Sequence, residues 1–309
     1  MPTRKSPRKG SLQYWPRKRA KKLLPRVNWN AINSNKKIKG FICYKAGMKT
    51  AIVEDNTSDS MTKGKQIAIP VTVLECPPMK IFSTRFYKNK KVAKDILAEN
   101  IEKDLKRKLK IPKNSKKAEI SGEGYDDVSV IVYSLVKKTK IKKTPDLIEL
   151  GLSGSLQDKL NFIKENLDKE INILDFFEIG ELVDLRGLTK GKGFSGPVKR
   201  FGITLRQHKS EKGVRKVGSI GPWHPARVTF RVPMAGQLGM FTRVIYNNKI
   251  IHAGKQEIKD LKNYGNINTN YIVVNGSVQG PSKRQLIITS ALRTSKKQTK
   301  KDFKFIELR

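Results

Sequence analysis

Residues 187–228 read GLTKGKGFSGPVKRFGITLRQHKSEKGVRKVGSIGPWHPARV. The surrounding segment Arg186–Arg231 holds 12 Lys or Arg, eight glycines and a single acidic residue, Glu211. It is too irregular for a helix and too rich in glycine for continuous strands. We therefore expect a long loop, and loops of this length are usually functional. Glycine lets a backbone approach a partner closely, and its alternation with cations suits a phosphate backbone. Such a segment would not fold alone, so we expect its order to come from the partner.

The whole chain shares this basic character. Its 309 residues include 65 Lys or Arg and 27 Asp or Glu, which gives a formal net charge of +38. That charge argues against a free enzyme for small neutral substrates, because such an enzyme would stick to every polyanion in the cell. The expected partner is a polyanion, either a nucleic acid or an anionic membrane surface. Glycine and proline break the cationic stretches, so no amphipathic membrane helix is expected.

Cysteine content and hydropathy narrow the class of protein further. With 37% hydrophobic residues the chain can bury a core. Cys43 and Cys76 are too few for a disulfide framework or a zinc site, and we expect both to be packed hydrophobes in a reducing cytosol. No apolar run reaches the roughly 18 residues of a membrane span, and the N-terminal MPTRKSPRKG precedes no apolar signal region. These features predict a soluble, cytoplasmic protein.

Residues 1–40 are the most one-sided part of the chain, with 13 Lys or Arg and no acidic residue. Four prolines exclude a continuous helix. Tyr14, Trp15 and Trp29 are interleaved with the cations, as in arms whose rings stack on bases while Lys and Arg meet phosphates. We interpret this segment as an extended RNA-binding arm. The alternative is a nuclear-localisation-like or unspecific basic tail.

Residues 88–175 have a different composition, with 20 Lys or Arg and 15 of the 27 acidic residues. Apolar residues and i,i+4 ion pairs within Val92–Leu109 predict a helix that Pro112 ends. A second helix is expected to begin at Ser155, with Asp158 in a capping box. Val128–Val136 predicts a buried strand between them. We expect a compact α/β insertion that faces solvent more than the polyanion.

The rest of the chain is typical of β-structure. Phe41–Cys43 and Ile67–Glu75 predict a hairpin with an irregular loop, in which Pro70 lies at an edge or a bulge. Further strands are expected at 176–185, Val228–Val232, Gly239–Tyr246, Tyr271–Val274 and Gln285–Ala291. Short strands separated by Gly, Asn and Pro turns favour a small barrel or sandwich. The expected fold is mainly β with an α/β insertion, divided into 1–40, 41–87, 88–175 and 176–309, with the loop 186–231 inside the last part.

The sequence holds no convincing catalytic or cofactor-binding motif. No frame fits a P-loop, and Gly191-x-Gly193-x-x-Gly196 matches the letters of a dinucleotide fingerprint without an amphipathic helix behind it. The three histidines, His208, His224 and His252, have no carboxylate or cysteine at metal-ligand spacing. We expect no catalytic residue, no metal and no cofactor. The alternative class is an RNA-modifying or nucleotide-dependent enzyme with basic arms, and a DNA-compacting protein is disfavoured by the glycine-rich loop and the β segments.

Nine positions at fixed offsets match the signature of a known family. They are Phe177, Asp184, Gly187, Thr189, Gly191, Lys192, Gly193, Gly196 and Arg200. This pattern resembles the universal third protein of the large ribosomal subunit, the ribosomal protein L-three family, in its archaeal and eukaryotic branch. Further blocks agree in order along the chain: GSLQYWPRKRA, FICYKAGMKT, ECPPM, GVRKVGSIGPWHPARV and MAGQLG. The length favours an archaeal source.

The resemblance implies a β-barrel of the translation-protein type with an α/β insertion, an N-terminal arm and a long central loop. It implies a non-catalytic constituent of the large subunit that binds its ribosomal RNA, neighbours other ribosomal proteins and supports early assembly. The loop tip, Gly221 to Pro225, would approach the peptidyl transferase centre, with Trp223 nearest the RNA. One departure is Glu211, an acid just before the Gly-x-Arg-Lys block, where the family usually carries a basic run, often with a histidine. No local phosphate contact is carried over there.

The predicted RNA-binding residues are the cations and rings of the arm and the loop. They are Arg4, Lys5, Arg8, Lys9, Tyr14, Trp15, Arg17, Lys18, Arg19, Lys21, Lys22, Arg26, Trp29, Lys190, Lys192, Lys199, Arg200, Arg206, His208, Arg215, Lys216, Trp223, His224 and Arg227. The predicted loop glycines are Gly187, Gly191, Gly193, Gly196, Gly213 and Gly221.

Overall fold

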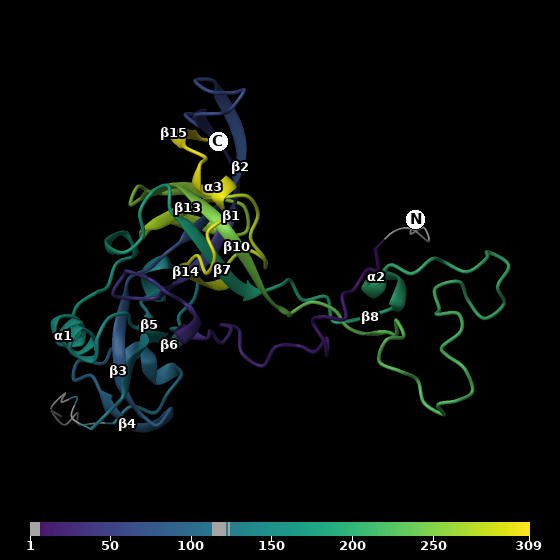
Figure 1. The fold of residues 1–309 in the computed structure, drawn as a ribbon, viewed down its shortest axis with the longest axis horizontal. Helices are drawn as coiled ribbons and strands as arrows, with labels where there is room; N and C mark the ends of the chain where they lie inside the picture. Colours follow the sequence, from purple (N-terminus) through teal and green to yellow (C-terminus); the bar gives the residue numbers. More distant parts are fainter. Residues whose placement is uncertain (1–6, 113–121, 123) are drawn as a thin grey trace. The chain divides into compact units, whose positions relative to one another are not determined.

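The computed structural model describes residues 7–112, 122 and 124–309. This part of the chain is mainly β-structure with few helices, as the sequence predicted (Figure 1). It divides into two compact units. We call residues 7–22 together with 188–242 the basic unit, and residues 23–187 together with 243–309 the core unit.

The largest sheet has seven strands. They are β1 (Gly40–Asp55), β2 (Gln66–Glu75), β7 (Leu182–Leu188), β10 (Thr242–Gly254), β13 (Tyr271–Asn275), β14 (Gln285–Ser290) and β15 (Phe303–Leu308). Their order is β14-β7-β10-β13-β2-β1-β15, and β14 also pairs with β1. The register places Ile42 opposite Ile287 in the β1–β14 pair and Val73 opposite Val273 in the β2–β13 pair. β14 thus has a partner on each side, so neither of its edges is left open.

Apolar residues of these strands form the main core. Phe41, Ile42, Leu286 and Ile288 are fully buried, in keeping with the preference of β-branched and aromatic residues for packed sheet faces. Both cysteines are buried and free, as the sequence predicted. Burial raises the pKa of the Cys76 thiol, so this group stays protonated and behaves as a small hydrophobe.

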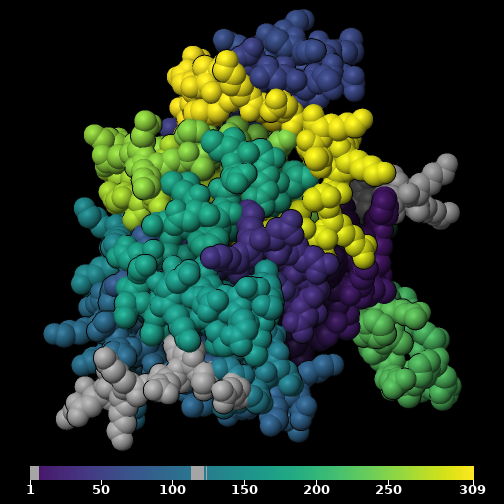
Figure 2. Space-filling model, turned by 60° about the vertical axis from the view of Figure 1, so that its left-hand side comes forward, coloured from purple at the N-terminus to yellow at the C-terminus, as the bar shows by residue number. Residues whose placement is uncertain are grey.

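The β1–β2 hairpin is confirmed, although β1 is much longer than the three residues that the sequence suggested. Pro70 pairs with Thr50 of β1, whereas the β13 pairing reaches only as far as Val71, so the proline lies where β2 has one neighbour. On its other edge, β1 pairs with β14 along its first half and with β15 along its far half. In Figure 2 this C-terminal segment (yellow) lies beside the hairpin (blue).

The segment expected as the insertion, 88–175, lies in a four-stranded sheet and a helix, and the first strand of that sheet begins before residue 88. Its strands are β3 (Met79–Lys88), β4 (Lys91–Leu97), β5 (Asp127–Ser134) and β6 (Leu147–Gly151), in the order β4-β3-β5-β6. The helix is α1 (Leu156–Asn166), and it begins as predicted: the Ser155 side chain accepts from the Asp158 backbone N–H and the Asp158 carboxylate accepts in return. Leu160, Phe162 and Ile163 of α1 are buried in the main core.

The prediction of a helix over Val92–Leu109 is wrong. The residues form β4 and, after a gap, the short 3₁₀ turn η2 (Lys103–Arg107). Asn89 and Lys90 both have positive φ, 51° and 61°, which makes a tight turn that folds β4 back onto β3. The apolar residues of this segment recur at helical spacing, but the preceding turn directs the chain back along β3. Pairing with that strand therefore overrides the local helical preference.

Other strand predictions need smaller corrections. Val228–Val232 forms no strand, 176–185 is extended only from Leu182, and the strand expected at Gly239–Tyr246 begins at Thr242 and continues to Gly254. The predicted strands at Tyr271–Val274 and Gln285–Ala291 are confirmed. The remaining elements are short. They are η1 (Trp29–Ala31), η3 (Val136–Thr139), η4 (Ile173–Asp175), β8 (Phe194–Ser195), α2 (Pro197–Phe201), β9 (Gly236–Gln237), β11 (Ile258–Leu261), β12 (Gly265–Ile267) and α3 (Lys296–Thr299).

Residues 23–39 belong to the core unit although the sequence places them in the basic arm. Ile38 forms a β-bridge with Leu152, and the Lys39 N–H donates to the Gly151 carbonyl. Ile32 and Ile38 are buried in the main core. Burial of apolar side chains holds this half of the predicted arm against the folded protein.

Candidate nucleic-acid interface

The basic unit concentrates positive charge. Its sequence holds 18 Lys or Arg and one acidic residue, Glu211, so less than a quarter of the chain carries almost half of the net charge of +38. Within the described part of this unit, Glu211 forms no ion pair with any of these cations. Like charges at this density repel one another, and a polyanion relieves that repulsion.

A short helix in the glycine-rich segment supplies the hub of the unit. α2 starts with Pro197, whose fixed φ suits the first helical position, and ends at Gly202 in the left-handed conformation with φ 63°. The expectation of a loop without a helix, which came from the irregular, glycine-rich sequence, is therefore wrong at these five residues, which are too few to show a helical periodicity. The helix places Phe201 inside the unit, where it is 4% exposed.

Cations of the N-terminal segment stack on this ring. The Arg17 guanidinium lies 4.7 Å from the centre of the Phe201 ring and 5.4 Å from that of Phe241. The guanidinium of Arg8 lies 5.8 Å from the Phe201 ring, and that of Arg200 lies 5.0 Å from it. Each such contact stabilises by about 0.5–2 kcal/mol. The aromatic ring thus holds several cations that would otherwise repel one another.

Hydrogen bonds and a ring contact join the two segments of the unit. Arg17 donates to the Arg200 carbonyl at 3.1 Å, and Arg8 donates to the Arg231 carbonyl at 2.7 Å. The Trp15 ring lies 5.5 Å from the Phe230 ring. The guanidinium of Arg200 donates in turn to the carbonyls of Gln237 and Met234. Three predicted RNA-binding residues, Arg8, Trp15 and Arg17, therefore also hold the arm to the loop, and Arg200 joins two parts of the loop.

Most of the other predicted residues present their side chains to solvent. The exposed ones are Arg8, Lys9, Tyr14, Lys18, Arg19, Lys21, Lys22, Arg26, Lys190, Lys192, Lys199, Arg206, His208, Arg215, Lys216, Trp223, His224 and Arg227. Trp223 is 88% exposed, which is unusual for the largest apolar side chain. Phe194 is 81% exposed in the same unit. Exposed rings among exposed cations are the surface that a single-stranded or looped nucleic acid uses.

The sequence matches the profile of ribosomal protein L3 over residues 1–125 and 118–308. The large ribosomal subunit protein uL3 of Methanocaldococcus jannaschii is 40% identical over 306 residues, covering 93% of this chain and 91% of the relative. The uL3 protein of Archaeoglobus fulgidus is 38% identical over 308 residues, covering 94% and 93%. This chain belongs to the ribosomal protein L3 family. As the sequence predicted, it resembles the archaeal members of this family, and it is a structural constituent of the ribosome and not an enzyme.

In this L3 family member, two predicted site residues serve the core unit. Trp29 packs beside Gly40 and Gly151, where an added Cβ would lie 2.9 Å or less from the indole. Gly187 packs under Leu286, and a Cβ there would overlap the leucine methyl group. The ring and the glycine therefore have packing roles. Arg4 and Lys5 lie outside the described residues.

The other predicted glycines fall into two kinds. Gly193, Gly213 and Gly221 have positive φ, and at Gly221, beside the exposed Trp223, φ is 141°, which L side chains avoid. Gly191 and Gly196 have ordinary φ, and an added Cβ would lie 3.0 Å from Met240 at Gly191 and in open space at Gly196. Backbone conformation therefore explains three of the six glycines.

The three histidines are distributed over the two units. His208 and His224 are exposed in the basic unit. His252 stacks on Phe305 with ring centres 4.3 Å apart, and burial lowers its pKa. Among residues 7–112, 122 and 124–309, no three His, Cys, Asp or Glu side chains gather as they would around a metal ion. In the same residues, no helix combines the length and the apolar character that crossing a membrane requires.

Reading the sequence alone missed the rings that organise the basic unit. Phe201, Phe230 and Phe241 contact Arg17 and Trp15, yet the predicted RNA-binding residues include no phenylalanine. A phenylalanine in a loop made mostly of Gly, Lys and Arg could have pointed to such a role. Outside a strand of the core, its ring is available to stack with the surrounding cations.

Proposed function

We propose that the basic unit is the principal RNA-binding part of this ribosomal protein, and that its partner is large-subunit ribosomal RNA. Membership of the family makes the chain a structural constituent of the large ribosomal subunit. The observation that carries the proposal is the concentration of almost half of the net charge on a unit with one acidic residue. RNA phosphates would take the place of the missing carboxylates.

Two kinds of side chain would share the binding. Exposed cations such as Lys190, Lys192 and Lys216 would contact phosphates and supply most of the affinity. The exposed rings of Trp223 and Phe194 would stack on unpaired bases, which tolerates any sequence. Arg17 would act mainly by fixing the arm against the loop, and Arg200 by joining α2 to residues 234–237.

The family resemblance supports a finer placement. We infer that Gly221 to Pro225 form the loop tip and extend towards the peptidyl transferase centre, with Trp223 nearest the RNA. The positive φ of Gly221 and the full exposure of the neighbouring indole support a tip that contacts a partner and no part of its own chain. We infer too that residues 1–40 and 186–231 act together during early assembly of the subunit in the cytoplasm, beside other ribosomal proteins.

The pairing of the seven-stranded sheet supports the barrel implied by the resemblance. β14 pairs with both β7 and β1, so six strands from β14 round to β1 follow each other with no unpaired end. We propose that these strands close into a translation-protein-type barrel. Closure would remove the sheet edges that otherwise invite aggregation.

Salt-dependent RNA binding tests the proposal on the full-length protein. Changing Lys190, Lys192, Lys199 and Lys216 to Gln should reduce the slope of log affinity against log salt by about 3, because each phosphate contact contributes about 0.7–0.9. The matched control changes four exposed lysines of the β3–β4 hairpin to Gln, namely Lys88, Lys90, Lys91 and Lys94. The control should keep the original slope. Equal losses in both variants would refute a dedicated RNA-binding unit.

A further inference from the structure

Two basic runs in the insertion lie side by side although about thirty residues separate them in sequence. The first, within 103–110, contains Lys103, Lys106, Arg107, Lys108 and Lys110, and the second, within 137–143, contains Lys137, Lys138, Lys140, Lys142 and Lys143. Leu105 of the first run packs in a small core with Tyr133 and Leu135, which lead into the second run. We call these two runs together the lysine surface.

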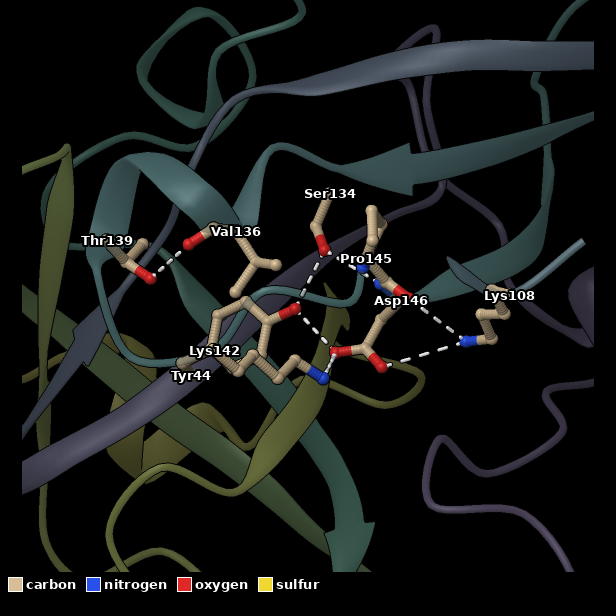
Figure 3. A network of polar contacts seen from close by, with 8 residues as sticks. All are labelled: Tyr44, Lys108, Ser134, Val136, Thr139, Lys142, Pro145 and Asp146. Carbon is tan, nitrogen blue, oxygen red and sulfur yellow. Dashed lines mark hydrogen bonds and ion pairs between the residues drawn. The ribbon is translucent and has the colours of Figure 1, made fainter. Parts of the chain in front are cut away.

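Ion pairs fix the two runs to each other. The Lys137 ammonium lies 3.3 Å from the Asp104 carboxylate, and Lys108 donates to the Pro145 carbonyl at 3.2 Å. Lys108 and Lys142 approach opposite oxygens of the buried Asp146 carboxylate, with Lys108 at 3.9 Å (Figure 3). Lysines from both runs thus share one acidic anchor.

Asp146 is itself anchored to the core unit. The Tyr44 hydroxyl of β1 donates to its carboxylate at 2.5 Å, and the Asp146 N–H donates to the Ser134 hydroxyl at 3.2 Å (Figure 3). Burial and the adjacent carboxylate raise the pKa of Tyr44 well above its ordinary value, so its proton stays in this network. The acids Asp104 and Asp146 therefore pair with Lys108, Lys137 and Lys142, which come from both runs.

The outer side keeps cations that have no acidic partner. Lys103, Lys106, Arg107, Lys110, Lys140 and Lys143 are exposed, and none forms an ion pair with any residue that the structure describes. Lys138 is different, because it pairs with Glu170 at 2.7 Å. A solvated face normally mixes both signs of charge, whereas six cations of this surface have no acidic partner among the described residues.

The excess of positive charge in the insertion is confined to the two basic runs. Residues 103–110 and 137–146 hold ten Lys or Arg and two acids, Asp104 and Asp146. The rest of 88–175 holds ten Lys or Arg and 13 Asp or Glu. The positive charge of the insertion therefore comes entirely from the lysine surface, and overall composition had suggested a neutral face towards solvent.

We propose that the lysine surface is a second RNA-binding site, which takes the phosphate backbone of a ribosomal RNA helix. Exposed lysines are compact point charges that suit phosphates read by position and not by base, as in A-form RNA. The inference rests on the proposed function, because it places the same RNA against a further part of the chain. It differs in assigning RNA contacts to the insertion.

Lysine acetylation followed by mass spectrometry tests this site. The full-length protein is treated with a small acylating reagent, free and bound to large-subunit ribosomal RNA. Lys103, Lys106, Lys140 and Lys143 should react several-fold more slowly in the complex, as should Lys190 and Lys192 of the basic unit. The control lysines of the β3–β4 hairpin, Lys88, Lys90, Lys91 and Lys94, should react alike in both states.

The outcomes separate the two proposals. Protection of the basic unit without the lysine surface would overturn the second site and leave the proposed function intact. Protection of neither would overturn both. Protection of the lysine surface that appears only in ribosomal particles and survives nuclease digestion would show a protein partner in place of RNA, and would also overturn the inference.

A variant adds a measurement independent of chemical reactivity. Changing Lys106, Arg107, Lys140 and Lys143 to Gln removes none of the contacts that hold the two runs together. The folded core unit should keep its thermal stability, and the salt slope for RNA binding should fall by about 3. An unchanged slope would contradict the second site.

Discussion

The core unit and the basic unit differ in the partners that their Lys and Arg side chains have. In the core unit, cations meet carboxylates, as in the pairs Lys159–Asp127 at 2.7 Å and Arg85–Asp95 at 2.8 Å, over a large apolar core. In the basic unit, cations stack on Phe201 or donate to backbone carbonyls, and there is one acidic residue for 18 cations. The comparison teaches that the first unit is stabilised by burial, whereas the second is left electrostatically incomplete for a partner to complete.

The largest effect is expected from the buried carboxylate of Asp184, a core-unit residue. It accepts from the backbone N–H groups of Asn247 and Leu292 at 3.0 and 2.9 Å. Asp184→Ala leaves both donors without this acceptor, and we expect it to lower the free energy of unfolding by about 3 kcal/mol. Chemical denaturation of the full-length protein measures the change.

Asp59→Ala is the matched control, because Asp59 is exposed in the β1–β2 loop. It should change stability by less than about 0.5 kcal/mol. Similar stabilities of the Asp184 and Asp59 variants would show that the carboxylate does not hold these loops, and the contrast between the two units would lose its basis.

The next effect should be confined to the basic unit. Phe201→Ala removes the ring on which Arg17, Arg8 and Arg200 stack, so the arm should separate from the loop. Hydrogen exchange at the amide of Ala20, which donates to the Met240 carbonyl at 2.9 Å, should then be several-fold faster. The thermal unfolding of the core unit should stay the same.

Phe194→Ala tests whether any lost ring has this effect, since Phe194 is exposed in the same unit. Its amide exchange at Ala20 should match that of the unaltered protein. If Phe201→Ala leaves the exchange at Ala20 unchanged, or if both variants speed it equally, Phe201 is not the hub of the unit.

These two predictions show what the sequence could and could not supply. The signature residues, the basic loop and the exposed Trp223 were found from the sequence, because glycine, cations and tryptophan at fixed offsets are a local pattern. The β4 hairpin was missed because its apolar spacing is also helical and only the Asn89–Lys90 turn decides between them. The Phe201 hub and the lysine surface were missed because each depends on segments that meet only in the folded chain.

A smaller effect on RNA binding, with none on stability, is expected at Trp223. Since the indole is 88% exposed, Trp223→Ala should leave both units folded. Affinity for large-subunit RNA should fall by about 1–3 kcal/mol if the ring stacks on one base. Trp223→Phe keeps a stacking surface and should recover most of that affinity. Loss of thermal stability in the free Ala variant would place Trp223 in a packed core, contrary to the account.

The smallest effect is a pH dependence that arises from the buried Glu75. Its carboxylate accepts from the Tyr264 hydroxyl and from the backbone N–H groups of Asn268 and Thr269, and burial raises its pKa. Because the folded state binds this proton more tightly than the unfolded state, the contribution of Glu75 to stability is largest at low pH. It should fall as the pH rises from the ordinary carboxyl range through the raised pKa.

Glu75→Gln should remove this part of the pH dependence in denaturation measured across that range. Glu165→Gln, which alters an exposed carboxylate of α1, is the control and should retain it. An identical pH profile in the Glu75 variant and the unaltered protein would mean that this carboxylate does not couple proton binding to folding.

Hydrogen exchange of the full-length protein, free and bound to large-subunit RNA, tests the central contrast most directly. The amides of residues 7–22 and 188–242 should gain protection on binding, because RNA phosphates supply the charge that the basic unit lacks. The strands β1, β13 and β14 of the core unit should change little. Equal protection of the basic unit in the free and bound protein would contradict the account.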